Sequence, residues 1–339
     1  MSLDVMCVTP ASSAGWGPVT DLAVLAARLF DTTPRFIHPR RPYGKTRKVL
    51  SLAPQRRSGD RSLLLIASHP GDLLAMARPD LMIGRYGHVG VWIFDSFWAD
   101  RIPLFARRGA SIDHVWITDA EFVERYERTV QRPVSWLPWG TDALAAARQA
   151  HDDQRSTDVL RLGRQPSVWD DDDANRRYLS AHGMTYSGRF PDAGDGEANQ
   201  RRVRALLGDS KVVLASGNLA SPALYTHPTA EYISGRFTDA VAAGTVVAGR
   251  RPRCAAADLL PDEAWAEMDV TTRPAGLPVI TEAVEQYSPK RAARLRHHAL
   301  AHLDWRHRLA DIAATMQVQA PLLDLEMSAL AKEMTELAC

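Results

Sequence analysis

The sequence has few cysteines, no long apolar run and almost no net charge, and each absence excludes a class of protein. The three cysteines, at positions 7, 254 and 339, have neither the spacing of a zinc site nor that of a disulfide framework. No apolar run approaches the ~18 residues of a membrane-spanning helix, and the first ten residues lack the features of a secretion signal. We therefore expect a cytoplasmic protein without a transmembrane segment.

The charges are balanced. The 41 basic and 40 acidic residues leave a net charge of +1, so no overall field favours nucleic acid or an anionic membrane as a partner. Apolar residues make up 45% of the chain and charged residues 24%, which is typical of a globular protein. A chain of 339 residues is long enough for two domains, each with its own core.

Short apolar segments alternate with helical patterns along the chain, which predicts an α/β fold with parallel sheets. The expected strands cover residues 3–8, 35–38, 62–67, 89–94, 114–118, 134–142, 158–163, 184–188, 211–215, 245–248 and 278–280. A helix-prone and then polar stretch at 143–157 is the expected linker, which gives domains 1–150 and 151–339. We expect residues 40–61 to form a basic loop, either solvated or anion-binding, and the chain to be helical from residue 289.

A glycine-bearing loop lies between the first expected strand and a helical pattern at 19–30. Gly15 and Gly17 would place the free N–H groups of the helix N-terminus near a phosphate. Their spacing is not that of the dinucleotide fingerprint, so NAD is not expected. A plain tight turn without a ligand is the alternative.

Polar residues follow three expected strands of the first domain. His69 follows 62–67, Asp95 follows 89–94 and Asp119 follows 114–118, so all three reach the carboxyl edge of one sheet. Phe97 and Trp98 come just after Asp95, and an apolar wall makes a carboxylate a better base. Asp95 and His69 are the candidates for proton transfer, and each also has a purely structural interpretation.

Residues 229–249 contain two carboxylates, Glu231 and Asp239, separated by seven residues. The pattern predicts Glu231 in a loop, Asp239 in the first turns of a helix that ends at Gly244, and then a buried strand. Nucleotides bind at such an edge of a parallel sheet. Two solvated charges beside an amphipathic helix are the alternative.

This stretch resembles the nucleotide-sugar signature of GT-B glycosyltransferases, in which Glu, seven residues and Glu or Asp precede a helix that ends in Ala-Ala-Gly. It is most similar to the group 1 and CgeB-like branch, whose motif reads roughly G-R-x-x-[ED]-A-x-A-x-G. The matching residues here are Gly235, Arg236, Asp239, Ala240, Ala242 and Gly244. Residues 136–142, WLPWGTD, resemble the interdomain passage of the same enzymes.

The resemblance implies two Rossmann-like domains facing across a cleft, with a nucleotide-sugar donor, such as a UDP or GDP sugar, in the second. Asp239 would accept hydrogen bonds from the ribose, and Glu231 would lie near the transferred sugar. Arg164 and Arg236 would neutralise the diphosphate, and His227 would be a further donor-binding residue. Many relatives have a lysine a few residues after the position of Arg164, and this sequence has none there.

The expected function is therefore a hexosyltransferase-like transfer to an unidentified small-molecule or glycan acceptor, without a separate cofactor. No metal is expected, because the four aspartates at 170–173 suit a helix start and the histidines at 297–307 suit a surface helix face. Arg236 or the loop at Gly15 and Gly17 would then take the place of the missing lysine in binding the diphosphate. A nucleotide-sugar epimerase and a non-catalytic nucleotide- or sugar-binding protein are the alternatives, and the oligomeric state is open.

Overall fold

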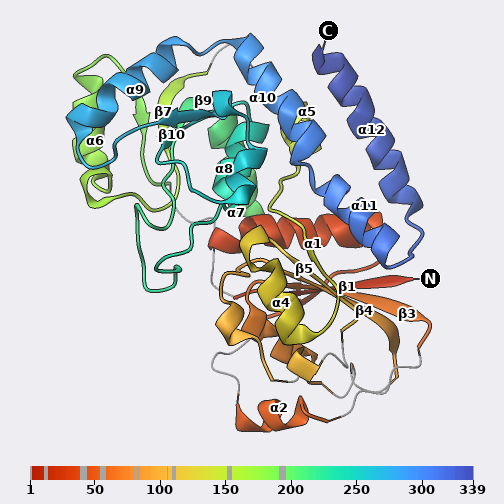
Figure 1. Cartoon of the computed structure of the whole chain (residues 1–339). Coiled ribbons are helices and arrows are strands. Elements are labelled where there is room, and N and C mark those ends of the chain that lie inside the picture. Colours follow the sequence, from red (N-terminus) through yellow and green to blue (C-terminus); the bar gives the residue numbers. More distant parts are fainter. Residues whose placement is uncertain are drawn as a thin grey trace. The chain divides into compact units, whose positions relative to one another are not determined.

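The computed structural model describes residues 2–10, 14–38, 44–53, 59–78, 81, 84–104, 106–108, 112–150, 155–190 and 196–338. The chain divides into two compact units. Unit 1 consists of Met1–Pro138 and Arg306–Met327, and unit 2 consists of Trp139–Trp305 and Ser328–Cys339. Figure 1 labels many of the helices and strands of both units. No described helix is long and apolar enough to cross a membrane.

Unit 1 contains a six-stranded parallel sheet with the strand order β2-β1-β3-β4-β5-β6. Its strands are β1 (Leu3–Val8), β2 (Arg35–Ile37), β3 (Arg61–Ala67), β4 (Tyr86–Ile93), β5 (His114–Ile117) and β6 (Val134–Trp136). The side chains of β3 are buried from Ser62 onward, as expected for a parallel strand that is covered on both faces. Helix α1 (Gly17–Leu29) packs against β1, and α4 (Val123–Val130) packs against β6.

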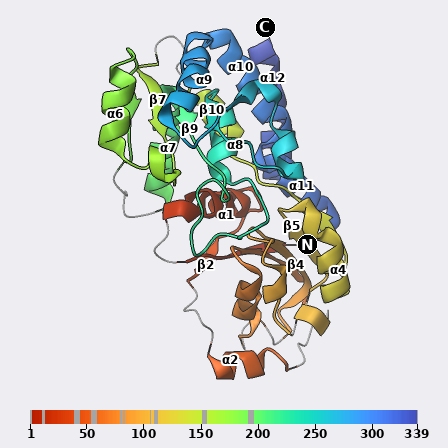
Figure 2. The same ribbon diagram turned by 60° about the vertical axis from the view of Figure 1, so that its left-hand side comes forward.

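Unit 2 contains a five-stranded parallel sheet with the order β11-β10-β9-β7-β8. Its strands are β7 (Thr157–Arg161), β8 (Tyr186–Ser187), β9 (Ser210–Leu214), β10 (Val246–Gly249) and β11 (Trp265–Glu267). Its helices include α5 (Ala143–Arg148), α6 (Asp172–Ser180), α7 (Gly196–Gly208), α8 (Gly235–Ala242), α9 (Arg273–Glu285) and α10 (Pro289–His302). Helices α7 and α9 pack against β9, α8 packs against β10, and α6 packs against β8. Helix α6 also lies beside β7 in Figure 1 and Figure 2. Helices α11 (Trp305–Thr315) and α12 (Pro321–Ala338) follow.

The predicted α/β fold with two parallel sheets is confirmed. The predicted arrangement of residues 229–249 is also confirmed, because α8 ends just before Gly244 and β10 follows. Gly244 has φ +73°, a left-handed conformation that glycine adopts without strain and that commonly ends a helix.

Two expectations about the elements are wrong. Residues 278–280 belong to α9 and form no strand; Thr272 caps this helix by accepting a hydrogen bond from the Ala275 N–H at 3.2 Å. The last strand is instead β11, a three-residue segment that was not predicted from the sequence. Within the expected basic loop, Lys45–Leu50 forms helix α2, and residues 40–43 and 54–58 lie outside the described part.

The stretch expected as a linker also contains structure. Residues Ala143–Arg148 form α5, which packs against α8 and α10 inside unit 2. The Leu144 N–H donates to the Asp304 carboxylate at 2.9 Å, which fixes the start of α5 within this unit. The chain first passes from unit 1 to unit 2 between Pro138 and Trp139, whereas the sequence places this boundary near residue 150. The segment Arg306–Met327 belongs to unit 1, although the sequence places it in the second domain.

Candidate functional site

The strand order of unit 2 reverses between β7 and β9. The chain runs from β7 outward to β8, returns to the other side of β7 as β9, and continues to β10 and β11. Open parallel sheets bind ligands outside the carboxyl ends of their strands at such a reversal, because the neighbouring loops diverge there. The loops that follow β7 and β9 are therefore the expected walls of a binding site.

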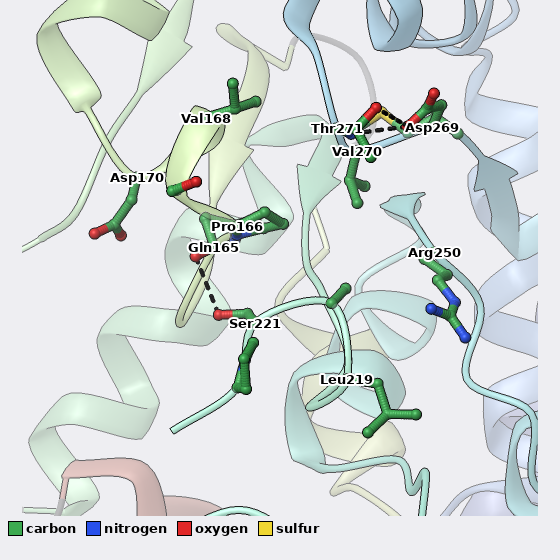
Figure 3. A pocket seen from close by; sticks show the side chains of 14 residues that line it. Gln165, Pro166, Val168, Asp170, Leu219, Ser221, Arg250, Asp269, Val270 and Thr271 are labelled. Atoms are coloured by element: carbon green, nitrogen blue, oxygen red, sulfur yellow. Dashed lines mark hydrogen bonds between the residues drawn. The ribbon is translucent and has the colours of Figure 1, made fainter. Parts of the chain in front are cut away.

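A pocket of about 860 Å³ lies at these loops (Figure 3). The segments that follow β7, β9, β10 and β11 line it, and Pro166, Val168, Leu219 and Val270 supply apolar surface. The Ser221 hydroxyl donates to the main-chain oxygen of Gln165 at 3.0 Å, which joins the first two of these segments. The size is typical of a site for a small molecule.

Arg236 lies in the first turn of α8 and contacts the loop after β7. Its Nε donates to the Ser234 hydroxyl at 3.1 Å and its Nη1 to the Ser216 main-chain oxygen at 3.3 Å. Gly163 has φ +73°, and a Cβ atom there would lie 2.6 Å from Nη1 of Arg236. Glycine thus provides both the backbone conformation and the space for the guanidinium.

Arg164 is the second cation at this place. Its guanidinium lies over the ring of Tyr225, 4.7 Å from the centroid. Burial lowers the pKa of Arg236, and the charge of Arg164 lowers it further. Among the described residues neither arginine has a carboxylate partner, so two like charges share a partly buried place. The sequence predicted both arginines but gave no sign of Tyr225.

Glu231 lies in the loop before α8, and both of its oxygens have contacts. Its Oε1 is 3.4 Å from Nη2 of Arg250, and its Oε2 accepts a hydrogen bond from the Arg253 N–H at 3.2 Å. Arg250 also lines the pocket. Sequence reasoning missed Arg250, although its position directly after a buried strand was a usable signal.

His227 has a defined tautomer. Its Nδ1 accepts hydrogen bonds from the N–H groups of Thr229 at 3.2 Å and Ala230 at 2.8 Å. In neutral imidazole the proton must then lie on Nε2, so the side chain presents a hydrogen-bond donor.

Asp239 is buried and hydrogen-bonded within the protein. Its Oδ1 accepts from the Thr141 hydroxyl at 2.7 Å and its Oδ2 from the Gln200 amide at 2.6 Å. Burial raises the pKa of Asp239, and these two hydrogen bonds act in the opposite direction. Each oxygen could accept a second hydrogen bond, but Asp239 is only 4% exposed, so little of the carboxylate is open to a ribose hydroxyl. The contacts therefore favour a structural role in which Asp239 joins α8 to α7 and to the start of unit 2.

In unit 1, His69 follows β3 and caps the short helix η2 (Pro70–Met76). Its Nδ1 accepts from the Gly71 N–H at 2.9 Å, which leaves the proton of the neutral ring on Nε2. Nη1 of Arg101 lies 3.4 Å from Nε2, and the Arg101 guanidinium stacks on the Trp98 ring at 3.6 Å. A proton on Nε2 would face Arg101, which can only donate, so the contacts with Gly71 and Arg101 compete for the single lone pair of the neutral ring.

Asp95 follows β4 and is half-buried. Its N–H donates to the Ser68 main-chain oxygen at 3.1 Å, so the ends of β3 and β4 are tied together. The Trp98 ring lies 6.5 Å from that of His69. The structure thus brings the segments of His69, Asp95 and Trp98 together at one edge of the sheet.

Asp119 follows β5 and was not selected from the sequence. It is 4% exposed, and burial raises its pKa to about 7. Its Oδ2 lies 2.5 Å from the Ser96 hydroxyl. Nothing in the sequence separates this carboxyl from other aspartates at strand ends.

Gly15 and Gly17 lie at the start of α1 in unit 1. Gly15 is exposed within the short helix η1 (Ala14–Trp16), and Gly17 is the buried first residue of α1. The N-cap residue, Trp16, makes no side-chain capping bond, and residues 11–13 lie outside the described part. The described residues also contain no group of three or more His, Cys, Asp and Glu side chains that could hold a metal ion.

Comparisons with known proteins identify the fold. No protein-family model and no curated protein matches the sequence. A glycosyltransferase from Rickettsia africae aligns over 93% of this chain and 98% of its own, at 9% identity and a TM-score of 0.56. HepE from Anabaena in complex with UDP aligns over 93% and 99%, at 10% identity and a TM-score of 0.53. Sucrose-phosphate synthase from Thermosynechococcus elongatus aligns over 94% and 98%, at 13% identity and a TM-score of 0.50.

These structures share their fold with the chain over nearly its whole length. The fold is that of GT-B glycosyltransferases, with two Rossmann-like domains, and the resemblance seen in residues 229–249 is confirmed at this level. Identities of 9 to 13% establish the fold alone.

Proposed function

We propose that the chain is a glycosyltransferase that takes a sugar from a nucleoside diphosphate sugar bound by unit 2. The observation that carries this proposal is the pair Arg164 and Arg236, two guanidinium groups without a carboxylate partner among the described residues, beside the pocket at the reversal of strand order. Two like charges in a partly buried place destabilise each other, and a doubly charged anion between them stabilises both. A diphosphate has that charge.

The pocket next to the arginines suits a nucleoside. Arg164 directly precedes Gln165 of the pocket, and the Ser216 that binds Arg236 through its main-chain oxygen also donates from its hydroxyl to Gln165 Oε1 at 3.3 Å. The apolar side chains of Pro166, Val168 and Val270 could enclose a base. HepE, one of the neighbours in fold, was crystallised with UDP, which supports this assignment.

Glycosyl transfer separates a diphosphate from an oxocarbenium-like sugar, so negative charge grows on the leaving group. Arg164 and Arg236 would stabilise this charge, and the Nε2–H of His227 would add a hydrogen bond. Glu231, held by Arg250 and the Arg253 N–H, would face the transferred sugar. Because two cations are already supplied by the chain, we expect transfer without a metal ion.

Unit 1 would bind the acceptor. If the anomeric centre inverts, Asp95 would take the proton of the acceptor hydroxyl, while His69 would orient that hydroxyl. The aromatic side chain of Trp98, with Arg101 stacked on it, suits the face of a sugar or another small acceptor. Asp239 would have no contact with the donor.

A thermal-shift screen of nucleosides, nucleoside diphosphates and their sugars tests the proposal. We expect nucleoside diphosphates to raise the melting temperature and nucleosides to do so much less; a ligand at about 100 times its Kd stabilises by about 2.7 kcal/mol. Arg176→Ala removes an exposed arginine of α6 that pairs with Asp173, and this control variant should show the same shift in melting temperature as the wild type. If no nucleotide stabilises the protein, the proposal is wrong.

Product analysis separates the alternatives. A transferase releases nucleoside diphosphate at a rate that depends on the acceptor, whereas an epimerase converts the sugar nucleotide without any acceptor. A binding protein would show the shift in melting temperature and no product with any donor and acceptor.

A further inference from the structure

Three oxygen-bearing side chains form a buried cluster at the ends of β4 and β5 in unit 1. Asp119 Oδ2 lies 2.5 Å from the Ser96 hydroxyl and 3.1 Å from the Thr118 hydroxyl. The two hydroxyl oxygens are 3.3 Å apart, and none of the three residues is more than 4% exposed. The cluster fixes the segment after β4, because the Phe97 N–H also hydrogen-bonds to Asp119.

The hydroxyl protons are too few for these contacts if Asp119 is ionised. Thr118 donates to the main-chain oxygen of Phe94, which can only accept, so its single proton is already used. Ser96 accepts from the Asp119 N–H at 3.1 Å and can give its one proton to Asp119 Oδ2. The contact between Thr118 Oγ1 and Asp119 Oδ2 then joins two acceptors. One further proton, carried by the carboxyl, turns this contact into a hydrogen bond from Asp119 to Thr118.

The surroundings also favour the protonated carboxyl. Burial raises the pKa of Asp119 to about 7 and the charge of Glu121 acts in the same direction, while the hydrogen bonds of Ser96, Thr118 and the Phe97 N–H oppose them. The Tyr126 hydroxyl of α4 is fully buried without a hydrogen-bond partner among the described residues. Burial raises its pKa, and the charges of Asp119, Asp95 and Asp100 add to this, whereas Arg125 lowers it. The charged groups around the cluster are thus mostly acidic.

We propose that Asp119 is a positioning residue that holds an exchangeable proton in this cluster and thereby controls the segment at 95–98, which presents Asp95 and Trp98. Loss of the proton puts a negative charge beside an oxygen of Thr118 and strengthens the hydrogen bonds from Ser96 and the Phe97 N–H, which both favour the ionised carboxylate. The geometry of this edge of unit 1 then changes with pH near neutrality. The effect on transfer rests on the proposed function, but the proton itself does not.

The proton can be observed directly by infrared difference spectroscopy on the whole protein labelled with ¹³C-aspartate. We expect the wild type and the control Asp113→Asn to show the carbonyl band of a protonated aspartic acid. As the pH rises, this band should disappear with a midpoint near pH 7. Asp113 binds the Val89 N–H at 2.7 Å, so the control changes another aspartate of the same unit. The band is expected to be absent in Asp119→Asn, with circular dichroism confirming the fold.

Thr118→Val tests the direction of the hydrogen bond without changing the carboxyl. If Thr118 accepts from Asp119, its removal weakens proton binding about tenfold and lowers the midpoint by about one pH unit. A midpoint that rises means that Thr118 donates instead and overturns the proposal. The proposal is also overturned if, at pH 6, the aspartic acid band of the wild type is no larger than that of Asp119→Asn.

A kinetic measurement tests the link to the proposed function. Asp119→Asn is expected to flatten the limb of the acceptor-dependent pH profile near pH 7, while Asp113→Asn keeps it. An unchanged limb overturns the positioning role. If no donor is turned over, the proposed function fails, and the infrared result still decides whether Asp119 holds the proton.

Discussion

Arg236 and Gly163 pack so closely that a Cβ atom on residue 163 would lie 2.6 Å from Nη1 of the arginine. This contact fixes the guanidinium of α8 beside the loop that carries Arg164. It therefore provides a way to move one of the two cations without changing any charge.

Gly163→Ala should lower the affinity for a nucleoside diphosphate about tenfold, because the new methyl group displaces Arg236 and one charge-assisted hydrogen bond is worth about 1.5 to 3 kcal/mol. Gly183→Ala is a matched control, since Gly183 has a similar φ of +76° and open space around its Cβ position. Isothermal titration calorimetry gives both affinities. Equal affinities in the two variants would show that the packing of Arg236 is not needed for binding.

Asp239→Ala should lower the free energy of unfolding by about 2 to 3 kcal/mol, because the buried donors of Thr141 and Gln200 lose their acceptor. Asp173→Ala, which removes an exposed carboxylate of α6, should change it by less than about 0.5 kcal/mol. Urea denaturation measures both. A stable Asp239→Ala protein with weakened nucleotide binding would instead support the ribose contact implied by the sequence.

Glu231 and Asp239 show which features of the candidate site can be predicted from the sequence and which cannot. It places Glu231 in a loop and Asp239 on α8 correctly, because glycine, helical spacing and a buried strand are local signals. The partners of Asp239 are Thr141 and Gln200, which lie 98 and 39 residues away, and no local pattern indicates them.

Burial and register explain the other differences from the sequence. Asp119 differs from neighbouring acidic residues by its hydroxyl partners Ser96 and Thr118, which follow β4 and β5 and are brought together by the parallel pairing of these strands. Pro278 lies inside α9, where proline is unusual, and the β-branched Val279 and Ile280 that follow it are typical of a strand, so the local pattern favours a short strand.

Asp119 also makes stability depend on pH. Its pKa rises from 3.8 to about 7 on folding, so the folded protein binds a proton more strongly. The contribution of this proton to the free energy of unfolding is fully present below pH 3.8 and is lost as the pH rises to about 7. Relative to Asp119→Asn, the wild type should lose up to about 4 kcal/mol of unfolding free energy across this window. Urea denaturation at a series of pH values measures the difference, and parallel curves for the two proteins would contradict the shift.

Asp95→Asn should reduce turnover by about 10² to 10⁴ if the product is inverted, because the acceptor hydroxyl then loses its base. His69→Ala should mainly raise the KM for the acceptor. Asp100→Asn, at an exposed position nearby, is the control. Product configuration by NMR accompanies the rates, and an inverted product made at full rate by Asp95→Asn would place the base elsewhere.

The most direct test of the account is calorimetric titration of UDP and GDP into the wild type, the double variant Arg164→Ala/Arg236→Ala and the control Arg176→Ala. If the guanidinium groups of Arg164 and Arg236 form a diphosphate site, at least one nucleotide binds the wild type and the control alike, and the double variant binds it at least about 100-fold more weakly. Binding of equal strength in all three proteins, or no binding of either nucleotide to the wild type, would contradict the account.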